Sequence, residues 1–161
     1  MAQTTLSRTL RDGSLAISDG AGTPQTMTVQ WAAGDFKWTV TKNFVQVLDR
    51  GVLQDVRSGD QEACTFSFTG RMTNLYGSAG SDPEQLYEML THRASLGLTS
   101  TASSGWPLAL QLVFTIANKA SAADETVTFA KCYFTSVEPS EADPNVIAVS
   151  GFSFEEEPAI A

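Results

Sequence analysis

The sequence has little of what metal sites and most hydrolytic enzymes require. Its 161 residues include one histidine, His92, and two cysteines, Cys64 and Cys132. It contains no Cys-x-x-Cys, no His-x-x-x-His, no glycine-rich phosphate loop and no Gly-x-Ser-x-Gly elbow to accompany the histidine. We therefore expect a protein that is not an enzyme, with no catalytic residue, no cofactor and no metal ion.

Long apolar runs and an excess of positive charge are also absent. No apolar run approaches the roughly twenty residues of a membrane-spanning helix, and no apolar block follows the arginines of the opening MAQTTLSRTLRDG. This pattern predicts synthesis in the cytoplasm without a secretory signal or membrane anchor. Eighteen acidic residues against ten basic ones give a formal charge of −8, which repels phosphate backbones. The charge argues against a conventional nucleic-acid binder.

Strand patterns are plentiful. Cys64, Phe66 and Phe68 alternate with Thr65, Ser67 and Thr69, which predicts a strand with one core face and one hydroxyl-rich face. Similar alternation predicts a hairpin of 26–31 with 36–41, a strand in NFVQVLD, and strands in PLALQLVFTIANK, ETVTFAKCYFTSVEP and NVIAVSGFSFEEE. In the last two segments the apolar phase slips by one, which predicts a bulge or a bend near Ala130 and Lys131 and another at Gly151. Both cysteines fall on apolar strand faces and are expected to be buried free thiols rather than a disulfide.

One helix interrupts the strands. Ser81 with Glu84, or Asp82 followed by Pro83, can cap its start. Leu86, Met89 and Leu90 follow at three- and four-residue spacing, and the helix is expected to end near Gly97. These features predict one mainly β domain over residues 1–161. We expect a β-sandwich or partly open barrel with one flanking helix at about 82–95, an N-terminal arm at about 1–17 and a C-terminal tip at about 155–161.

The charged passage after NFVQVLD is the main candidate in the sequence for a functional surface. It runs from Asp49 to Glu62 and contains acids, two arginines and two glycines before the strand that begins near Cys64. By itself such a passage is either a mobile solvent loop or a surface built for contact. The residues alone do not choose between the two.

The layout of the chain resembles the tail tube (major tail) proteins of tailed bacteriophages. The resemblance rests on RDGSLAISDGAGTPQTMTVQW, on DRG followed by VRSGDQE and an alternating strand, on the proline-capped helix and on the three long strands that end in an acidic tip. The tubes of contractile tails and of type VI secretion systems are related to this family. The likeness covers almost the whole chain, but it includes no invariant chemical motif.

The resemblance implies a structural virion protein that assembles in the host cytoplasm. Hexameric rings would stack into a hollow tube, DNA would pass through its lumen without specific binding, and the tape-measure, tail terminator and baseplate or tail-tip proteins would be the partners. The passage after NFVQVLD would be an inter-ring stacking loop, with Asp49, Arg50, Gly51, Asp55, Arg57, Gly59, Asp60 and Glu62 as its candidate residues. The candidate lumen or subunit-contact face comprises Thr65, Ser67, Thr69, Gln111 and Thr115.

A ligand-binding or carbohydrate-binding β-sandwich is the alternative from another functional class. Trp31, Trp38 and Trp106 could serve such a module as stacking platforms. Trp31 and Trp38 fall on the apolar alternation and are expected in the core, which leaves Trp106, in SSGWPL, as the exposed candidate. This alternative predicts a monomer whose tryptophan fluorescence responds to sugars.

Overall fold

The computed structural model describes residues 13–30, 34–72, 74–75, 77, 85–117 and 123–161. The predicted mainly β architecture with one short helix is confirmed. The main sheet contains β1 (Gly13–Ser18), β2 (Thr26–Thr28), β3 (Lys37–Thr39), β6 (Thr65–Arg71), β7 (Leu110–Ile116), β8 (Glu125–Ser140), β9 (Val146–Ser153) and β10 (Ala159–Ile160). The remaining elements are β4 (Phe44–Asp49), β5 (Val52–Ser58), α1 (Leu86–Leu90) and the 3₁₀ helix η2 (Ala94–Leu96).

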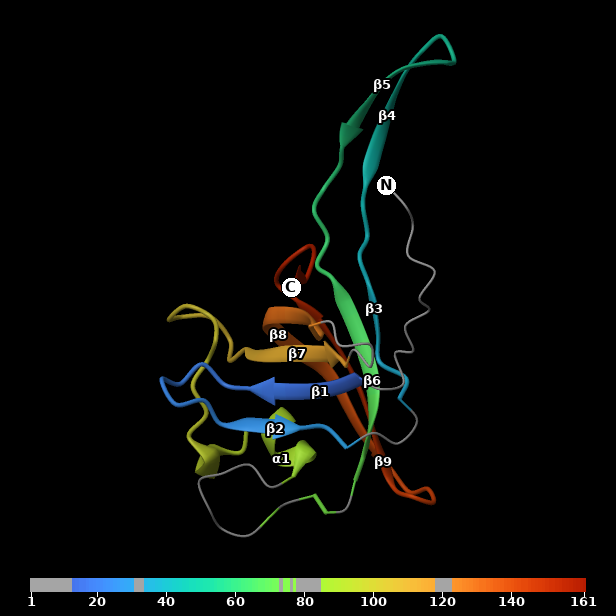
Figure 1. Cartoon of the computed structure of the whole chain (residues 1–161). Coiled ribbons are helices and arrows are strands. Elements are labelled where there is room, and N and C mark those ends of the chain that lie inside the picture. The colour runs from blue at the N-terminus through green and yellow to red at the C-terminus, as the bar shows by residue number, and fades with distance from the viewer. Residues whose placement is uncertain (1–12, 31–33, 73, 76, 78–84, 118–122) are drawn as a thin grey trace.

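The main sheet curls into a partly open barrel (Figure 1). Its order is β2-β1-β7-β8-β9-β6-β3, and every neighbouring pair is antiparallel. The ring of Phe36, just before edge strand β3, lies 4.9 Å from the ring of Phe114 on β7, although β8, β9 and β6 separate these strands in the sheet. The Arg71 amide at the end of β6 donates a 2.6 Å hydrogen bond to the Gln30 carbonyl beyond β2. The two ends of the sheet therefore meet, while the strand ladder itself stays open.

The core is aromatic and aliphatic, and it forms where strand alternation turns apolar side chains inward. On β6, Phe66 and Phe68 are buried while Thr65 faces solvent. On β7 the residues from Leu110 to Ile116 alternate between buried and half-buried positions. Phe129 of β8 is fully buried between the rings of Phe36, Trp38 and Phe66. The period-two pattern therefore identified the core faces of both strands.

Helix α1 closes one end of the barrel. Leu86, Met89 and Leu90 are buried, as their spacing predicts. The expected caps at Ser81, Asp82 and Pro83 lie outside the described residues, and the described helix begins at Leu86 with Gln85 as its N-cap.

The helical region ends as the sequence predicts, although it is not one continuous helix. The Thr91 C-cap ends α1, the short η2 follows, and Gly97 ends η2 in the left-handed conformation at φ 59°. The expected single helix at about 82–95 is therefore a shorter helix followed by a 3₁₀ turn.

Several predictions about strand pairing and chain ends are wrong. The predicted hairpin of 26–31 with 36–41 does not form, because β2 pairs with β1 and β3 pairs with β6. Strand β1 carries the fully buried Leu15 and Ile17, so an N-terminal arm can extend no further than residue 12, and residues 1–12 lie outside the described part. The expected C-terminal tip includes β10, which pairs with β8.

The bulge predicted at Gly151 is also wrong. The β6–β9 register continues without a shift, and Phe152 lies on the opposite face from the core, stacked on Tyr133 at 5.3 Å. The irregularity is in β8, which shifts register against β9 between Phe134 and Ser136. A second shift, where β8 passes β7, confirms the bulge predicted near Ala130 and Lys131.

Gly151→Ala should destabilise the protein, although Gly151 lies within a regular strand. A Cβ at this position would lie 2.3 Å from the backbone oxygen of Tyr133 and 2.9 Å from the Phe66 ring. Because the first of these atoms is backbone, β8 would have to shift, and we expect a loss of about 1–3 kcal/mol in the free energy of unfolding. Urea denaturation followed by circular dichroism measures it. Gly22→Ala is the matched control because no atom lies within 4 Å of its added methyl; equal stabilities for the two variants would contradict the packing described here.

Candidate assembly surfaces

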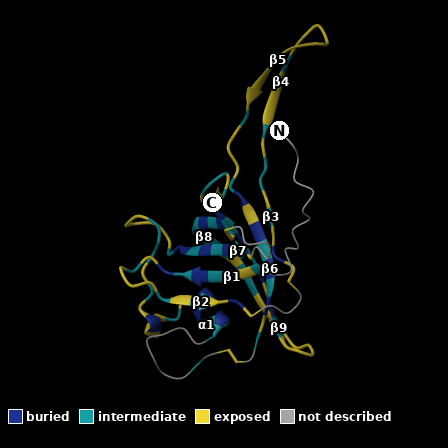
Figure 2. Cartoon of the chain, in the orientation of Figure 1, coloured by how far each residue is buried: buried dark blue, intermediate teal, exposed yellow. Residues whose placement is uncertain are grey.

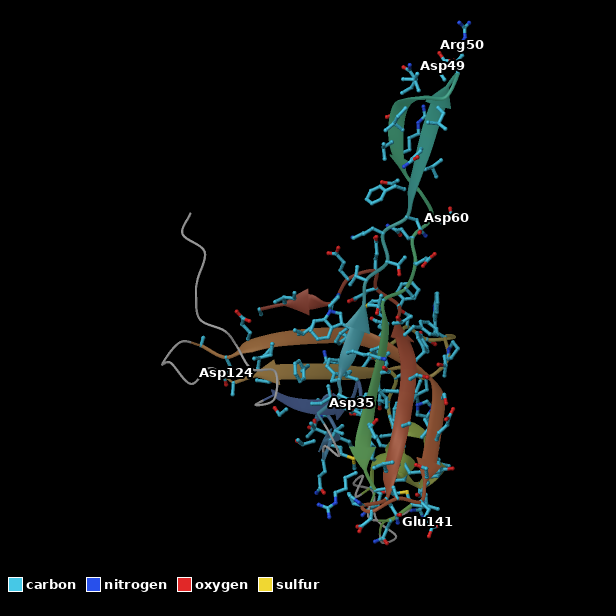
Figure 3. The ribbon with its side chains drawn as sticks, turned by 90° about the vertical axis from the view of Figure 1, so that its right-hand side faces the viewer. Asp35, Asp49, Arg50, Asp60, Asp124 and Glu141 are labelled. Atoms are coloured by element: carbon cyan, nitrogen blue, oxygen red, sulfur yellow. The ribbon has the colours of Figure 1, made fainter. Side chains whose placement is uncertain are left out.

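A hairpin projects from the barrel and has no strand partner there among the described residues (Figure 1). It consists of β4 and β5, and every residue of β5 is exposed (Figure 2). Arg50 at φ 49° and Gly51 at φ 83° form its two-residue turn. Positive φ at both central positions is what a type I′ hairpin turn requires. Asp49 and Arg50 lie at its tip (Figure 3).

The candidate stacking residues lie along this projection and at its base, but the passage that contains them is not a loop. The passage from Asp49 to Glu62 was expected to be a loop, whereas Val52–Ser58 is a strand paired with β4. The signal was present, since Asp-Arg-Gly supplies a two-residue turn between two segments that both contain valine and leucine.

The apolar side chains of the hairpin are its most informative feature. Six of them are at least half exposed: Phe44, Val45, Leu48, Val52, Leu53 and Val56. Residues that pair across strands point to the same face. Phe44 opposite Ser58, Gln46 opposite Val56 and Leu48 opposite Leu53 therefore form an uncharged face of the hairpin. We call this set the apolar face. The other face carries Asp49, Asp55 and Arg57 together with three valines, Val45, Val47 and Val52.

Three of the six charged side chains from Asp49 to Glu62, namely Asp55, Arg57 and Glu62, have partners within the chain. The Arg57 Nε and Asp55 Oδ2 atoms lie 3.0 Å apart on the same strand, and both side chains are more than half exposed. Such a surface pair contributes little to stability. The Asn43 side chain donates hydrogen bonds to the Asp60 carbonyl at 3.2 Å and to Glu62 Oε1 at 2.8 Å. Asp60 and Glu62 therefore lie at the base of the hairpin, not at its tip.

The base of the hairpin is also held by the C-terminal segment. The Gly59 amide donates to the Asn43 carbonyl at 2.8 Å. Lys42 Nζ lies 3.2 Å from Glu156 Oε1 and also contacts Glu157. These carboxylates, Glu157 first and Glu156 second, accept hydrogen bonds from Lys42 and raise its pKa. These ion pairs attach the base of the hairpin to the segment after β9. No pattern in the sequence predicts them.

A second surface is the outer face of four adjacent strands, β3, β6, β9 and the half of β8 from Tyr133 to Ser140. We call it the wall; its strands β6 and β9 lie at the front in Figure 3. The side chains that line its two shallow hollows are mostly small or hydroxylated: Thr39, Thr65, Ser67, Thr69, Thr135, Ser136, Ala148 and Ser150. Asp35 accepts hydrogen bonds from the Thr69 amide at 2.8 Å and its hydroxyl at 2.6 Å.

The wall brings together only part of the predicted lumen or contact face. Thr65, Ser67 and Thr69 lie on it, as expected for the outer side of β6. Gln111 and Thr115 are on β7, in the other half of the curled sheet, where Gln111 accepts a 3.2 Å hydrogen bond from the Ser18 hydroxyl. The structure therefore separates these two residues from the other three.

Both edges of the wall are open along the described chain. β3 pairs with β6 alone, and β8 from Tyr133 onward pairs with β9 alone. β3, β6, β9 and β8 alternate in direction because each neighbouring pair is antiparallel. The two open edges consequently run in opposite directions. An edge strand of one copy can then pair with the other edge of a second copy in antiparallel fashion.

The few reactive side chains do not form a catalytic or metal site in the described residues. Both cysteines are buried free thiols, as predicted, and burial raises the pKa of each. Partial burial lowers the pKa of His92, which lies just after α1. No cluster of three or more potential metal ligands occurs in the part of the chain that the structure describes. Within the same part, no helix has the length and apolar character needed to cross a bilayer.

Comparison with known proteins finds similarity in structure but not in sequence. No protein-family model matches the sequence, and no curated protein matches it. A chain of the PVC sheath–tube complex, an extracellular contractile injection system in the extended state, aligns over 98% of this chain and 93% of its own length, with a TM-score of 0.64 and 7% identity. A chain of the PVC sheath/tube terminator in the extended state aligns over 99% of both chains, with a TM-score of 0.65 and 8% identity.

A third match comes from the baseplate of the anti-feeding prophage. It covers 100% of this chain and 97% of the other, with a TM-score of 0.51 and 9% identity. At these identities the comparisons establish the fold, and they do so over almost the whole chain. The resemblance to tail tube proteins is thereby confirmed at the level of the fold.

Proposed function

We propose that this protein is a structural subunit of a tail-type particle, and specifically the subunit whose hexameric rings stack into a hollow tail tube. The observation that carries the proposal is the projecting hairpin with six large apolar side chains at least half exposed. A two-stranded hairpin is at best marginally stable alone in water, and exposed apolar surface of this kind marks a site of protein contact. A tube subunit has a partner for it in the adjacent ring.

Ring formation is supported by the two open edges of the wall. In a ring, β3 of each copy would pair with the free half of β8 of the next, and the antiparallel directions of these edges allow the pairing to repeat. Closure would remove every free edge of the wall and leave its hydroxyl-rich face lining the lumen.

The wall suits a conduit because it offers few groups that could hold DNA. Its two cations, Lys37 and Arg71, are matched by two anions, Asp35 and Glu138. The net charge of −8 is therefore not concentrated on this face. Uncharged hydroxyls and balanced charges leave no phosphate-binding stripe. DNA would pass through this lumen during ejection without specific binding.

The fold neighbours support the assignment to a particle of this kind. They come from a sheath–tube complex, a sheath/tube terminator and a baseplate. By analogy of fold, the partners proposed here are other copies of the chain, a tape-measure protein, a tail terminator and baseplate or tail-tip proteins. The particle would be a virion or a related extracellular injection system, assembled in the cytoplasm of the producing cell.

Electron microscopy of the purified protein over a range of concentrations tests this proposal, with light scattering to follow mass. We expect rings or tubes of uniform diameter with sixfold end views, because the two open edges complement each other around a ring and the adjacent ring covers the apolar face in the proposed assembly. A strict monomer at every concentration would contradict it. That result would favour the ligand-binding module, for which the exposed Trp106 is the stacking platform to test by fluorescence titration with sugars.

A further inference from the structure

An aromatic hollow lies at the edge of the wall, beside β8 and the end of β9, and includes none of the residues of the hairpin's apolar face. The rings of Trp106 and Phe154 meet edge to face at a centroid distance of 5.3 Å, and their side chains are 55% and 50% exposed. Lys131 Nζ lies 5.3 Å from the centroid of the Phe154 ring. Together with Ala102, Ser103 and Tyr133, these three residues line a hollow of about 90 Å³.

The hollow exposes apolar surface to solvent. Two large aromatic side chains half exposed at one place indicate a contact site rather than scattered surface residues. The Tyr133 hydroxyl is buried within the chain and is therefore not open to a partner. A partner that supplies an apolar group would cover the two exposed rings.

The position of the hollow indicates which segment of a second copy can supply an apolar side chain to it. Tyr133 is the first residue of the half of β8 that belongs to the wall, and the edge of this half that faces away from β9 is free. β3 and β9 run in the same direction, because β6 lies antiparallel between them. The chain therefore leaves β3 toward the hairpin at the same end of the wall at which β9 runs into Phe154. A second copy that pairs its β3 antiparallel with the free edge of β8 brings its residues 40–44 to the Tyr133 end of that edge, where the hollow lies.

We propose that the hollow of Trp106 and Phe154 is a docking site for residues 40–44 of a neighbouring copy in the same ring. Phe44, 66% exposed in the free chain, is the apolar side chain that this segment brings. Each copy would thus hold the base of the next hairpin. The inference rests on the proposed ring and adds to it a specific lateral contact.

Assembly measurements on single variants provide the first test. Trp106→Ala should raise the critical concentration for ring or tube formation at least tenfold, while Trp106→Phe should largely restore assembly. Because Trp106 is exposed, the melting temperature of the unassembled protein should not change. Leu75→Ala, at another exposed apolar residue, is the matched control and should assemble like the unchanged protein. Phe44→Ala combined with Trp106→Ala should be no worse than the more severe single variant, because both remove one contact.

Cross-linking in trans provides the second test and locates the partner. Thr41→Cys and Ser103→Cys are prepared separately, mixed, assembled and treated with a short bismaleimide; the native thiols are buried. A covalent dimer should form in this mixture and not when Ser95→Cys replaces Ser103→Cys. Two results together would overturn the docking site and leave the tube proposal standing. The cysteine variants would form rings in which no cross-link appears, and Trp106→Ala would assemble at the same critical concentration as the unchanged protein. A failure of the unchanged protein to form rings would overturn both.

Discussion

Two carboxylates on the apolar face of the hairpin, Leu48→Asp with Leu53→Asp, should abolish tube formation and leave the barrel folded. The two leucines face each other across β4 and β5 and are 58% and 53% exposed. Their replacement therefore removes little buried surface from the single chain. In a stacked assembly the same positions become covered, and burying unpaired carboxylates costs several kcal/mol per subunit. Repeated around each ring, this cost should outweigh the stacking energy.

Negative-stain electron microscopy and light scattering measure this loss, and thermal unfolding of the unassembled variant checks its fold. Ser95→Asp with Ala123→Asp adds the same charge at exposed positions outside the hairpin and the wall, and this control should assemble normally. Arg50→Glu with Arg57→Glu should have a smaller effect, seen as shorter tubes, because Arg57 already pairs with Asp55 in its own strand. Tubes of normal length from the leucine double variant would remove the apolar face from the interface.

Phe129→Ala should lower the free energy of unfolding by about 3–5 kcal/mol, the largest loss of stability expected from a single truncation here. The ring is fully buried, and its centroid lies 6.0 to 6.3 Å from the centroids of Phe36, Trp38 and Phe66. These three residues lie on or just before the adjacent strands β3 and β6, and β9 separates those strands from β8 in the sheet order. Removing the ring leaves a cavity that strands joined by continuous hydrogen-bonded ladders cannot easily close.

Urea denaturation at concentrations where the protein is unassembled measures this effect. Phe44→Ala is the matched control, because it makes the same chemical change at a ring that is 66% exposed, and it should alter stability by no more than about 0.5 kcal/mol. Equal losses for the two variants would mean that the hairpin packs on the body in solution. An unchanged midpoint for Phe129→Ala would place the core elsewhere.

The fold class and the inward faces could be predicted because they depend on local alternation. Phe66, Phe68 and Leu112 are buried where the period of two predicts. Pairing could not be predicted, since the segments around Met27 and Trp38 are close in sequence and look like one hairpin. In the structure they lie near opposite ends of the sheet order. Each finds a longer partner, β1 or β6, and the curl of the sheet then brings its two ends together.

Phase slips show a similar division between local and distant causes. The slip near Ala130 is a property of β8 itself and was predicted. The position of Phe152 in the sequence predicts a similar phase slip in β9, but its ring instead stacks on Tyr133 outside the core. Gly151 keeps the strand regular by letting the Tyr133 carbonyl come close. Only the neighbouring strand reveals this, because nothing in the sequence of β9 shows which of its faces meets another aromatic ring.

The candidate assembly residues divide in the same way. Sequence reasoning located the passage from Asp49 to Glu62 and emphasised its charges, whereas the structure shows that the exposed apolar side chains beside them are more informative. An apolar residue in a strand is ordinarily assigned to the core. Its exposure becomes known only when the strand is seen to project from the barrel. The same holds for Phe154, whose exposure depends on where β9 ends.

The sequence by itself determined a β-rich chain with buried free thiols, one short helix and no constellation of catalytic or metal-binding residues, because composition and short-range periodicity carry that information. The tertiary structure alone decided which strands are neighbours, which edges remain open and which apolar side chains remain exposed. These properties depend on contacts between residues far apart in the chain, such as Phe36 with Phe114 and Gln30 with Arg71. The proposed assembly follows from the edges and faces that those contacts leave free.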